Sequence, residues 1–319
     1  MSAPGGDPLH VVRRAVSPVK RLCLFSPSGV SVQAAPVRLA LQRLRALGFD
    51  AYLDEAALKR FQRFGGDDDT RLAALHRIAR DAPAVAMAVR GGYGLTRLLD
   101  RIDWPLLVRS VEAGTRWVGL SDVTALQLGL LAHGGADSGS WAGPTASEDF
   151  GRSDEAGGVD EVTAACFCEA MSGELEAVGF RSETGFDGLE LKGRLWGGNL
   201  TVLLSLLGTP HWPRVRGGIL FLEDVNEQPY RVERMLLQLH QAGVLAAQKA
   251  VLLGHFTVQT KSPLDRGFSL RGVVAHLRAV CRTPILSGLP FGHVPTKVTL
   301  PVGARVQLAV QGREVFVGW

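Results

Sequence analysis

RWVGLSDVTALQLGLLAHG (residues 116–134) contains, in one segment, the pattern that decides the fold of this chain. Its first part, RWVGLSD (116–122), is typical of a short buried strand that runs into a loop. Its second part, VTALQLGLLAHG (123–134), has the length and the apolar content of a helix. The segment therefore predicts a strand, a tight turn and a helix in immediate succession.

The same succession occurs earlier in the chain. LCLFSPSG (22–29) predicts a buried strand that ends in a loop, and residues 32–48 have apolar positions at helical spacing. Another helix is predicted over 71–81, AVAMAVRGGYG (84–94) predicts a strand that runs into glycines, and LTRLLDRI (95–102) predicts a helix. Strands that alternate with helices of about 10–15 residues indicate a mostly parallel sheet with helices on both faces.

Three of the predicted strand ends carry residues that are unusual in ordinary connecting loops. They are Ser26–Gly29, Arg90–Gly94 and Gly119–Thr124. In an open parallel sheet, ligands bind beyond the carboxyl ends of the strands. We therefore expect these three segments, which are far apart in the sequence, to converge on one site.

The length of 319 residues favours two domains. Residues 1–19 are interpreted as a flexible N-terminal arm, residues 20–173 as an α/β domain, and residues 174–319 as a smaller α/β domain. The segment 133–158 is rich in Gly, Ser and Asp and is predicted to be a long loop. Long loops in compact domains tend to be functional.

The composition excludes several classes of protein. Basic and acidic residues, 35 and 31 in number, are intermixed along the chain, so nucleic acid is not an expected partner. The first residues lack the apolar core of a signal peptide, and no apolar run approaches the roughly 18–20 residues that span a bilayer. Four cysteines match neither a zinc site nor a disulfide scaffold, which indicates buried thiols. We expect a cytoplasmic protein without a metal, a cofactor or membrane contact.

Ser121 lies where the predicted strand turns into the helix over 123–134. A serine on such a turn presents its hydroxyl away from the backbone, and the N–H of the next residue, Asp122, stabilises an anion at the helix N-terminus. These are the requirements of a serine nucleophile and its oxyanion hole. The same segment also fits an ordinary helix N-cap, which is the more common arrangement when the segment is considered alone.

Two further segments carry groups suited to this chemistry. The glycines of RGGYG (90–94) expose backbone N–H groups that could form an oxyanion hole or hold phosphate, although a purely structural turn fits as well. Glu223 and Asp224 end the apolar strand GGILFLEDV (217–225). A carboxylate there could orient a histidine or simply face solvent.

Among the eight histidines, His293 has the most informative surroundings. It is flanked by Gly and Pro in PFGHVP (290–295), a loop from which an imidazole can act as general base. His255, at the end of the strand KAVLLGH (249–255), is the second candidate. No two histidines have the spacing of metal ligands, so metal catalysis is not expected. A serine at a turn, a carboxylate at a strand end and a loop histidine together meet the requirements of acyl transfer.

Seven short segments also occur in a characteristic order. They are S-P-S-G (26–29), R-G-G-Y-G (90–94), G-L-S-D-V-T-A-L (119–126), W-G-G-N-L (196–200), L-G-T-P (207–210), L-E-D-V-N-E-Q-P-Y-R (222–231) and G-H-V-P (292–295). In these segments, and over nearly its whole length from about residue 20, the chain resembles the LD-carboxypeptidase family of serine peptidases.

The resemblance implies a Ser–Glu–His triad. In it, Ser121 is the nucleophile, His293 is the general base, and Glu223 orients the imidazole. The resemblance also implies an oxyanion hole formed by the backbone N–H groups of Asp122 and Gly92. The residues expected to bind the substrate are Arg90, Gly91, Tyr93, Asn199 and Arg231.

The family resemblance further implies an N-terminal flavodoxin-like domain, a smaller C-terminal α/β domain, a site in the cleft between them and a homodimer. The implied reaction is hydrolysis of the L–D peptide bond that releases terminal D-Ala from murein tetrapeptides during cytoplasmic recycling of the cell wall. The substrate would be of the L-Ala-D-Glu-diaminopimelate-D-Ala type. Whether the third residue is diaminopimelate or lysine stays open at this point.

Two other functions are compatible with parts of the sequence. A related branch of the family cleaves microcin-type peptide-nucleotide antibiotics and confers immunity, but the run E-D-V-N-E-Q-P-Y-R (223–231) favours the murein branch. A non-catalytic protein could instead use the glycine loops to hold a nucleotide or a sugar phosphate. Such a binding protein has no use for Ser121, Glu223 and His293 meeting in one place.

Overall fold

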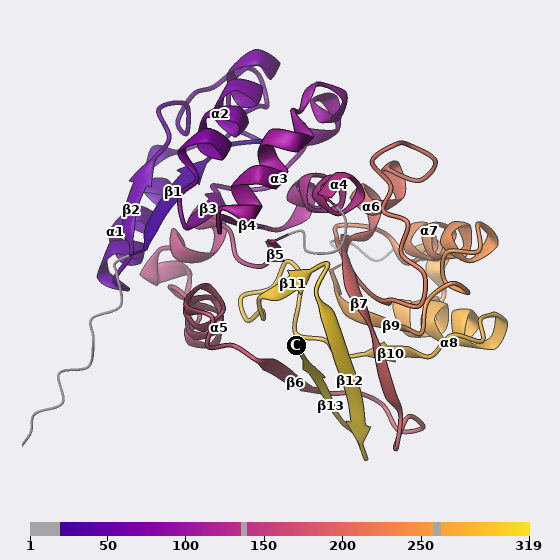
Figure 1. The fold of residues 1–319 in the computed structure, drawn as a ribbon. Helices are drawn as coiled ribbons and strands as arrows, with labels where there is room; N and C mark the ends of the chain where they lie inside the picture. Colours follow the sequence, from indigo (N-terminus) through magenta and orange to yellow (C-terminus); the bar gives the residue numbers. More distant parts are fainter. Residues whose placement is uncertain (1–19, 135–138, 258–262) are drawn as a thin grey trace, which may run out of the picture.

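Two β-sheets with helices packed around them form the computed structural model, which describes residues 20–134, 139–257 and 263–319 (Figure 1). The N-terminal arm predicted over 1–19 lies outside these residues.

The first sheet has the strand order of a flavodoxin-like fold. Its strands are β1 (Arg21–Phe25), β2 (Asp50–Leu53), β3 (Val85–Ala88), β4 (Arg116–Gly119), β5 (Ser140–Ala142) and β11 (Leu300–Val302). They lie in the order β11-β5-β4-β3-β1-β2, and all pairs among β1 to β5 are parallel. The order 2-1-3-4-5 confirms the predicted fold class of the first half.

The helices of this half begin at polar caps that the sequence supplies. Asp67, Asp103 and Asp160 each accept a hydrogen bond from a backbone N–H in the first helical turn. The helices are α1 (Ala34–Ala46), α2 (Asp68–Asp81), α3 (Trp104–Glu112), α4 (Thr124–Gly134) and α5 (Glu161–Ser172), with 3-10 turns at Leu95–Arg97, Leu99–Arg101, Ser121–Val123 and Asp154–Ala156 and a π-helical turn at Ala146–Phe150.

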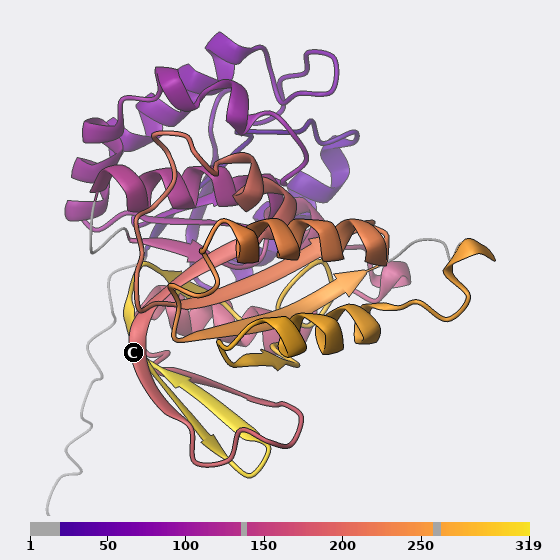
Figure 2. The same ribbon diagram turned by 90° about the vertical axis from the view of Figure 1, so that its right-hand side faces the viewer.

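The second sheet is mixed. Its strands are β6 (Ala177–Arg181), β7 (Glu190–Asn199), β8 (Ile219–Val225), β9 (Ala250–Thr257), β10 (Ile285–Ser287), β12 (Arg305–Gln311) and β13 (Glu314–Gly318). The spatial order is β10-β9-β8-β7-β12-β13-β6, with β7 to β10 parallel and the remaining pairs antiparallel. Its helices are α6 (Leu200–Ser205), α7 (Pro229–Gln241) and α8 (Leu270–Val280), with a 3-10 turn at Pro263–Asp265. Figure 2 shows α7 and α8 side by side on one face of this sheet.

Three segments differ from the sequence-based expectation. The helix expected over 95–102 is two 3-10 turns, and all the apolar residues of this segment are buried. The helix α3 was not predicted, although an Asp N-cap and a Pro in its first turn signal its start. The long loop expected over 133–158 contains β5 and the π-helical turn, and its residues 135–138 lie outside the described structure.

One strand from the C-terminal half crosses into the first sheet. β11 pairs antiparallel with β5, with Leu300 opposite Ala142 and Val302 opposite Ser140. The segment 297–303, expected as part of the second α/β unit, thus completes the edge of the first sheet. This crossing ties the C-terminal part of the chain, just after His293, to the strand beside β4.

The cysteines follow the expectation with one exception. None of the four forms a disulfide, and Cys23, Cys166 and Cys281 are buried. Cys168 is only partly buried, because it lies on α5 at the margin of the core. Burial raises the pKa of the Cys23 thiol to about 12, which keeps it protonated.

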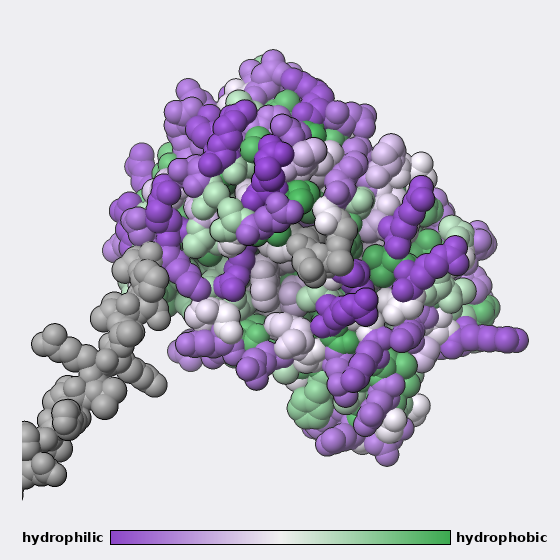
Figure 3. Space-filling view, in the orientation of Figure 1, coloured by the Kyte–Doolittle hydropathy of each residue, from purple (hydrophilic) through white to green (hydrophobic). Residues whose placement is uncertain are grey.

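The surface shown in Figure 3 carries mostly hydrophilic side chains over α1 to α3, with apolar residues scattered between them. Within residues 20–134, 139–257 and 263–319, every helix is too short or too polar to cross a membrane.

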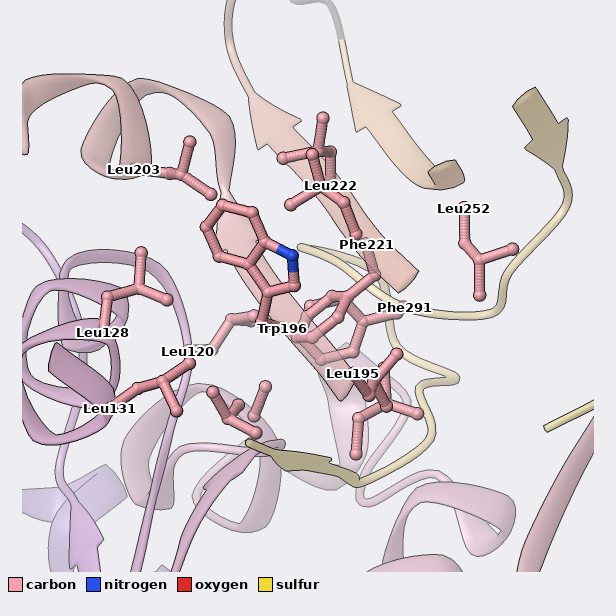
Figure 4. Packing of buried hydrophobic residues seen from close by; sticks show 14 of the residues in the cluster. Leu120, Leu128, Leu131, Leu195, Trp196, Leu203, Phe221, Leu222, Leu252 and Phe291 are labelled. Atoms are coloured by element: carbon pink, nitrogen blue, oxygen red, sulfur yellow. The ribbon is translucent and has the colours of Figure 1, made fainter. Parts of the chain in front are cut away.

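Of the two hydrophobic clusters among the described residues, the larger runs through both halves of the structure and the smaller lies within the first half. In Figure 4, Trp196, Phe221 and Phe291 of the second half lie together, and Leu120 and Leu128 of the first half approach them from one side. The rings of Phe221 and Phe291 meet edge to face at 5.3 Å. Because close-packed interiors resist deformation, this shared core fixes how the two halves dock.

Phe221→Ala is expected to lower the free energy of unfolding by about 3–5 kcal/mol, because it removes a fully buried aromatic side chain and leaves a cavity. The measurement is urea denaturation followed by circular dichroism. The matched control is Phe316→Ala, at a position that is 45% exposed, where we expect a change within about 0.5 kcal/mol. Equal losses in the two variants would contradict a shared core centred on Phe221.

Candidate active site

Ser121 occupies the turn between β4 and α4 in a strained backbone conformation. Its φ is +65°, a left-handed value that residues with a side chain adopt at a cost. The 3-10 turn Ser121–Val123 leads directly into α4. Gly119 permits this turn, because a Cβ there would lie 2.8 Å from the Val123 side chain. The backbone thus has the strand–turn–helix geometry that presents a serine hydroxyl.

The loop after β3 packs directly against Ser121. A Cβ on Gly91 would lie 2.5 Å from Ser121 Cβ and 3.0 Å from its Oγ, so only glycine permits this approach. The loop after β1 lies next to it, because the backbone N–H of Gly29 donates to Gly91 O over 3.0 Å. The three strand ends that were predicted to converge therefore lie together.

The carboxylate of Asp122 holds these loops in place. It is 2% exposed and accepts hydrogen bonds from Ser28 Oγ at 2.6 Å and from the backbone N–H of Leu95 at 2.9 Å. Burial raises the pKa of Asp122, and the two hydrogen bonds only partly oppose that shift. The side chain of Asp122 therefore stabilises the loops. Its backbone N–H is the first one after Ser121 in the chain.

Glu223 and His293 form a hydrogen-bonded pair. His293 Nδ1 lies 2.7 Å from Glu223 Oε2, and the Glu223 side chain is fully buried while that of His293 is 18% exposed. Burial lowers the pKa of His293, but the hydrogen bond and the charge of Glu223 raise it more, so the pKa lies above its ordinary value of 6.5. The pairing at Nδ1 leaves Nε2 to accept a proton.

Asn199 connects this pair to the helix that follows Ser121. Its Nδ2 donates to Glu223 Oε1 over 3.1 Å, and its backbone N–H donates to Thr124 Oγ1 over 3.0 Å. Gly198 makes room for this approach, since a Cβ there would lie 2.5 Å from Thr124 Oγ1. The contact fixes the carboxylate of Glu223 relative to the first turn of α4.

A second set of charged groups surrounds His293. Arg90 Nη2 lies 3.1 Å from Glu148 Oε1, and the negative charge of Glu148 favours the protonated form of His293, raising its pKa. Lys297 is buried in an ion pair with Asp149 and has the opposite effect on the pKa of His293. The negative charges of Glu223 and Glu148 therefore outweigh burial and Lys297, and the net effect favours the protonated imidazole.

The other sequence candidates with side chains are more exposed. Tyr93 is 44% exposed, and the guanidinium of Arg63 lies 5.6 Å from the centre of its ring. Arg231 Nε is paired with Glu227 Oε2 at 2.6 Å. His255, the second histidine candidate, is exposed on β9.

Among the hydrogen bonds of the described residues, none joins the Ser121 hydroxyl to the His293 ring. A series of hydrogen bonds nevertheless links the turn of Ser121 to His293, through Thr124, Asn199 and Glu223. Catalytic hydrogen bonds are often long before the substrate binds and tighten in the complex.

Two family models together match most of the chain. The LD-carboxypeptidase N-terminal domain matches residues 22–139, and the LD-carboxypeptidase C-terminal domain matches residues 192–308. The chain belongs to the LD-carboxypeptidase family. The family that its motifs resemble is therefore confirmed, and so is the expectation that the protein is an enzyme of the carboxypeptidase class.

Relatives of this LD-carboxypeptidase cover most of its length. A probable murein peptide carboxypeptidase of Bacillus subtilis is 30% identical, over 88% of this chain and 88% of the relative. A murein tetrapeptide carboxypeptidase of Pseudomonas aeruginosa is 28% identical, over 89% of this chain and 91% of the relative.

Solved structures share the fold. A muramoyltetrapeptide carboxypeptidase from Oxalobacter formigenes superposes with a TM-score of 0.83 at 36% identity, covering 94% of this chain and 99% of the other. The microcin self-immunity protein MccF superposes with a TM-score of 0.80 over 94% of this chain and 96% of the other, but at 20% identity. At this identity, the similarity to MccF shows a shared fold and nothing more.

Sequence reasoning missed several groups at the site of this LD-carboxypeptidase. Glu148, Asp149 and Lys297 were not candidates, although the segment 133–158 that carries the two acids was expected to be functional. The contact of Thr124 with Asn199 was also missed, because it joins residues 75 positions apart that no local pattern connects.

Glu223→Gln is expected to lower the pKa of His293 below its ordinary value of 6.5. The substitution removes the charge that stabilises the imidazolium and keeps the shape, so that burial acts with little opposition. The measurement is the titration of the histidine ring resonances by NMR. The exposed His276 on α8 is the internal control, and its titration curve should be the same in both proteins. An unchanged curve for His293 would refute the influence assigned to Glu223.

Proposed function

We propose that this LD-carboxypeptidase hydrolyses the L–D peptide bond of murein tetrapeptides and releases the terminal D-Ala, with Ser121, Glu223 and His293 as its catalytic triad. The observation that carries the proposal is the 2.7 Å contact between His293 Nδ1 and the fully buried Glu223. A buried carboxylate that fixes the imidazole tautomer is what a serine peptidase requires of its third residue.

The proposed reaction proceeds through an acyl-enzyme. His293 Nε2 takes the proton from Ser121 Oγ while this oxygen attacks the carbonyl carbon of the L-centre. The tetrahedral intermediate collapses, His293 donates the proton to the nitrogen of D-Ala, and the shortened peptide stays bound to Ser121 as an ester. Water, deprotonated by His293, then hydrolyses the ester and restores the serine. Glu223 stabilises the imidazolium in both steps.

The proposed oxyanion hole consists of the backbone N–H groups of Gly92 and Asp122. Gly92 has a φ of +107°, and in the described structure its N–H donates to no protein group. The N–H of Asp122 lies in the 3-10 turn that leads into α4, where the helix dipole favours a negative charge. Each such donor contributes about 3–4 kcal/mol to transition-state stabilisation in comparable sites.

Several groups near the triad are proposed to bind the substrate. Gly91 lets the peptide approach Ser121, while Arg90 and Tyr93 flank the pair of glycines and are at least partly exposed. Arg231, half exposed at the start of α7, is proposed to hold the free carboxylate of D-Ala. Asn199 is buried and donates to Glu223, so we assign it the orientation of the triad rather than a direct substrate contact.

The names of the relatives support a murein peptide as the substrate class. From this substrate we propose a part in cytoplasmic recycling of cell-wall peptides, carried out by a homodimer. The immunity function of MccF is not favoured, because that likeness has only 20% identity. A non-catalytic binding protein is not favoured either, since burying Glu223 against His293 is costly and serves no purpose in holding a phosphate.

Ser121→Ala is expected to reduce the release of D-Ala from L-Ala-D-Glu-diaminopimelate-D-Ala by at least about 10⁴-fold, because no nucleophile remains. The measurement is mass spectrometry of the reaction mixture over time, with a lysine-containing tetrapeptide in parallel.

The control for this experiment is Ser205→Ala, on the exposed side of α6, where turnover should stay the same. Circular dichroism and thermal unfolding should show that both variants are folded. Full turnover by a folded Ser121→Ala protein would refute the triad, whereas a wild-type protein inactive on both peptides would refute the substrate.

A further inference from the structure

We propose that the protein has a second ligand site, distinct from the triad, that binds a small molecule carrying a diphosphate or triphosphate group. A groove of about 870 Å³ lies at the amino-terminal ends of β7, β8 and β9. Its basic lining residues are Lys192, Arg194, Arg214, Arg216, Lys249 and Arg305.

The groove is far from the triad, although it uses the same strands. Lys192 and Arg194 lie near the start of β7, whereas Asn199 is its last residue. Seven residues of extended strand separate Lys192 from Asn199, which corresponds to roughly 20 Å. The groove and the catalytic groups thus lie at opposite ends of one parallel sheet.

The charged residues that line the groove are all of one sign. None of its described lining residues is acidic. Elsewhere on the surface, arginines pair with carboxylates, as Arg97 does with Asp68. Within the described parts of the chain, no carboxylate forms an ion pair with Arg214, Arg216 or Arg305. A concave surface with charges of one sign concentrates the electrostatic field and attracts counter-ions.

The strand register places two of the positive charges next to each other. Arg305 on β12 lies directly opposite Arg194 on β7 in the antiparallel pair. Like charges at directly opposed positions destabilise a sheet. Arg194 also donates a hydrogen bond to the carbonyl of Gly303, which holds its side chain in the groove wall.

The wall that carries two of the arginines is rigidly built. Gln248 is buried, and its Nε2 donates to the carbonyl of Val215 over 3.1 Å. The backbone N–H of Gly217 donates to Ala247 O over 2.7 Å. Arg214 and Arg216 flank the fixed Val215, and both side chains are exposed. The backbone that carries these two arginines is therefore preorganised, which reduces the entropic cost of binding.

A further ammonium group is also held in position. Lys249 Nζ donates to the carbonyl of Lys192 over 2.7 Å, which links the end of the β8–β9 connection to the start of β7. Hydrophilic side chains gather over β7 and β12 on the face shown in Figure 3. The basic residues thus come from four separate segments that only the folded chain brings together.

The chemistry of the groove selects a polyphosphate. Arginine donates paired hydrogen bonds to phosphate oxygens, and four of the six basic residues are arginines. One phosphate group cannot reach so many cations, whereas a diphosphate or triphosphate can. The volume is that of a small-molecule pocket, and Trp212, half-buried in the wall, could pack against a nucleobase.

The test is isothermal titration calorimetry of the full-length protein with inorganic triphosphate, inorganic phosphate, ATP and adenosine. We expect saturable binding of triphosphate and ATP at one site, weaker binding of phosphate, no binding of adenosine, and a loss of affinity as salt rises to about 0.15 M. The double variant Arg214→Gln/Arg216→Gln should bind triphosphate at least about 10-fold more weakly.

The matched control is Arg38→Gln/Arg109→Gln, which removes the same charge from exposed positions outside the groove and should change the affinity by less than about twofold. If ATP binds more tightly than triphosphate and Trp212→Ala removes only that difference, the ligand is a nucleotide. Equal affinities would assign the site to a polyphosphate without a base.

Three results would overturn the proposal. The first is the absence of saturable triphosphate binding, and the second is an equal loss of affinity in the two double variants. The third is a single-stranded RNA that binds through Arg214 and Arg216 more tightly than triphosphate does. Turnover of the tetrapeptide by the groove variants is a separate readout, so failure of the groove proposal and failure of the proposed function are distinguishable.

Discussion

The contact on which the site depends is the hydrogen bond between the backbone N–H of Asn199 and Thr124 Oγ1. Thr124 begins the helix that follows Ser121, and Asn199 ends β7 and donates to the carboxylate of Glu223. Glu223 in turn holds His293. One hydrogen bond thus joins the serine turn of one sheet to the acid and the histidine of the other, and the glycine before Asn199 exists to permit it.

The hydrophobic core fixes the position of the two sheets relative to each other. Leu120, immediately before Ser121, belongs to the same buried cluster as Trp196 and Phe221 of the second sheet. Because the cluster is continuous, the two halves cannot shift against each other without opening the core. The strained φ of Ser121 persists for the same reason: the packed residues on both sides of the turn fix the backbone, and their burial offsets the strain.

The sequence predicted what local patterns encode, which included the strand–turn–helix at Ser121, the glycine loop after β3 and the flavodoxin-like order of the first half. It did not predict α3, although the Asp cap, the Pro in the first turn and the apolar positions at helical spacing are all visible in the sequence. Nor did it predict the return of β11 to the first sheet or the ion pair of Arg90 with Glu148. These features depend on residues that are distant in sequence, and a single chain gives no local signal for them.

The adjacent acids Glu223 and Asp224 show how the fold separates two similar groups. Asp224 accepts hydrogen bonds from Asn199, from the hydroxyl and backbone N–H of Thr201, and from its own neighbour's N–H, so its oxygens are occupied by the start of α6. Among the described residues, Glu223 has one side-chain donor, Asn199, besides His293. A fully buried carboxylate is stable only with such partners. The strand therefore uses one acid to build the helix and leaves the other free to hold the imidazole.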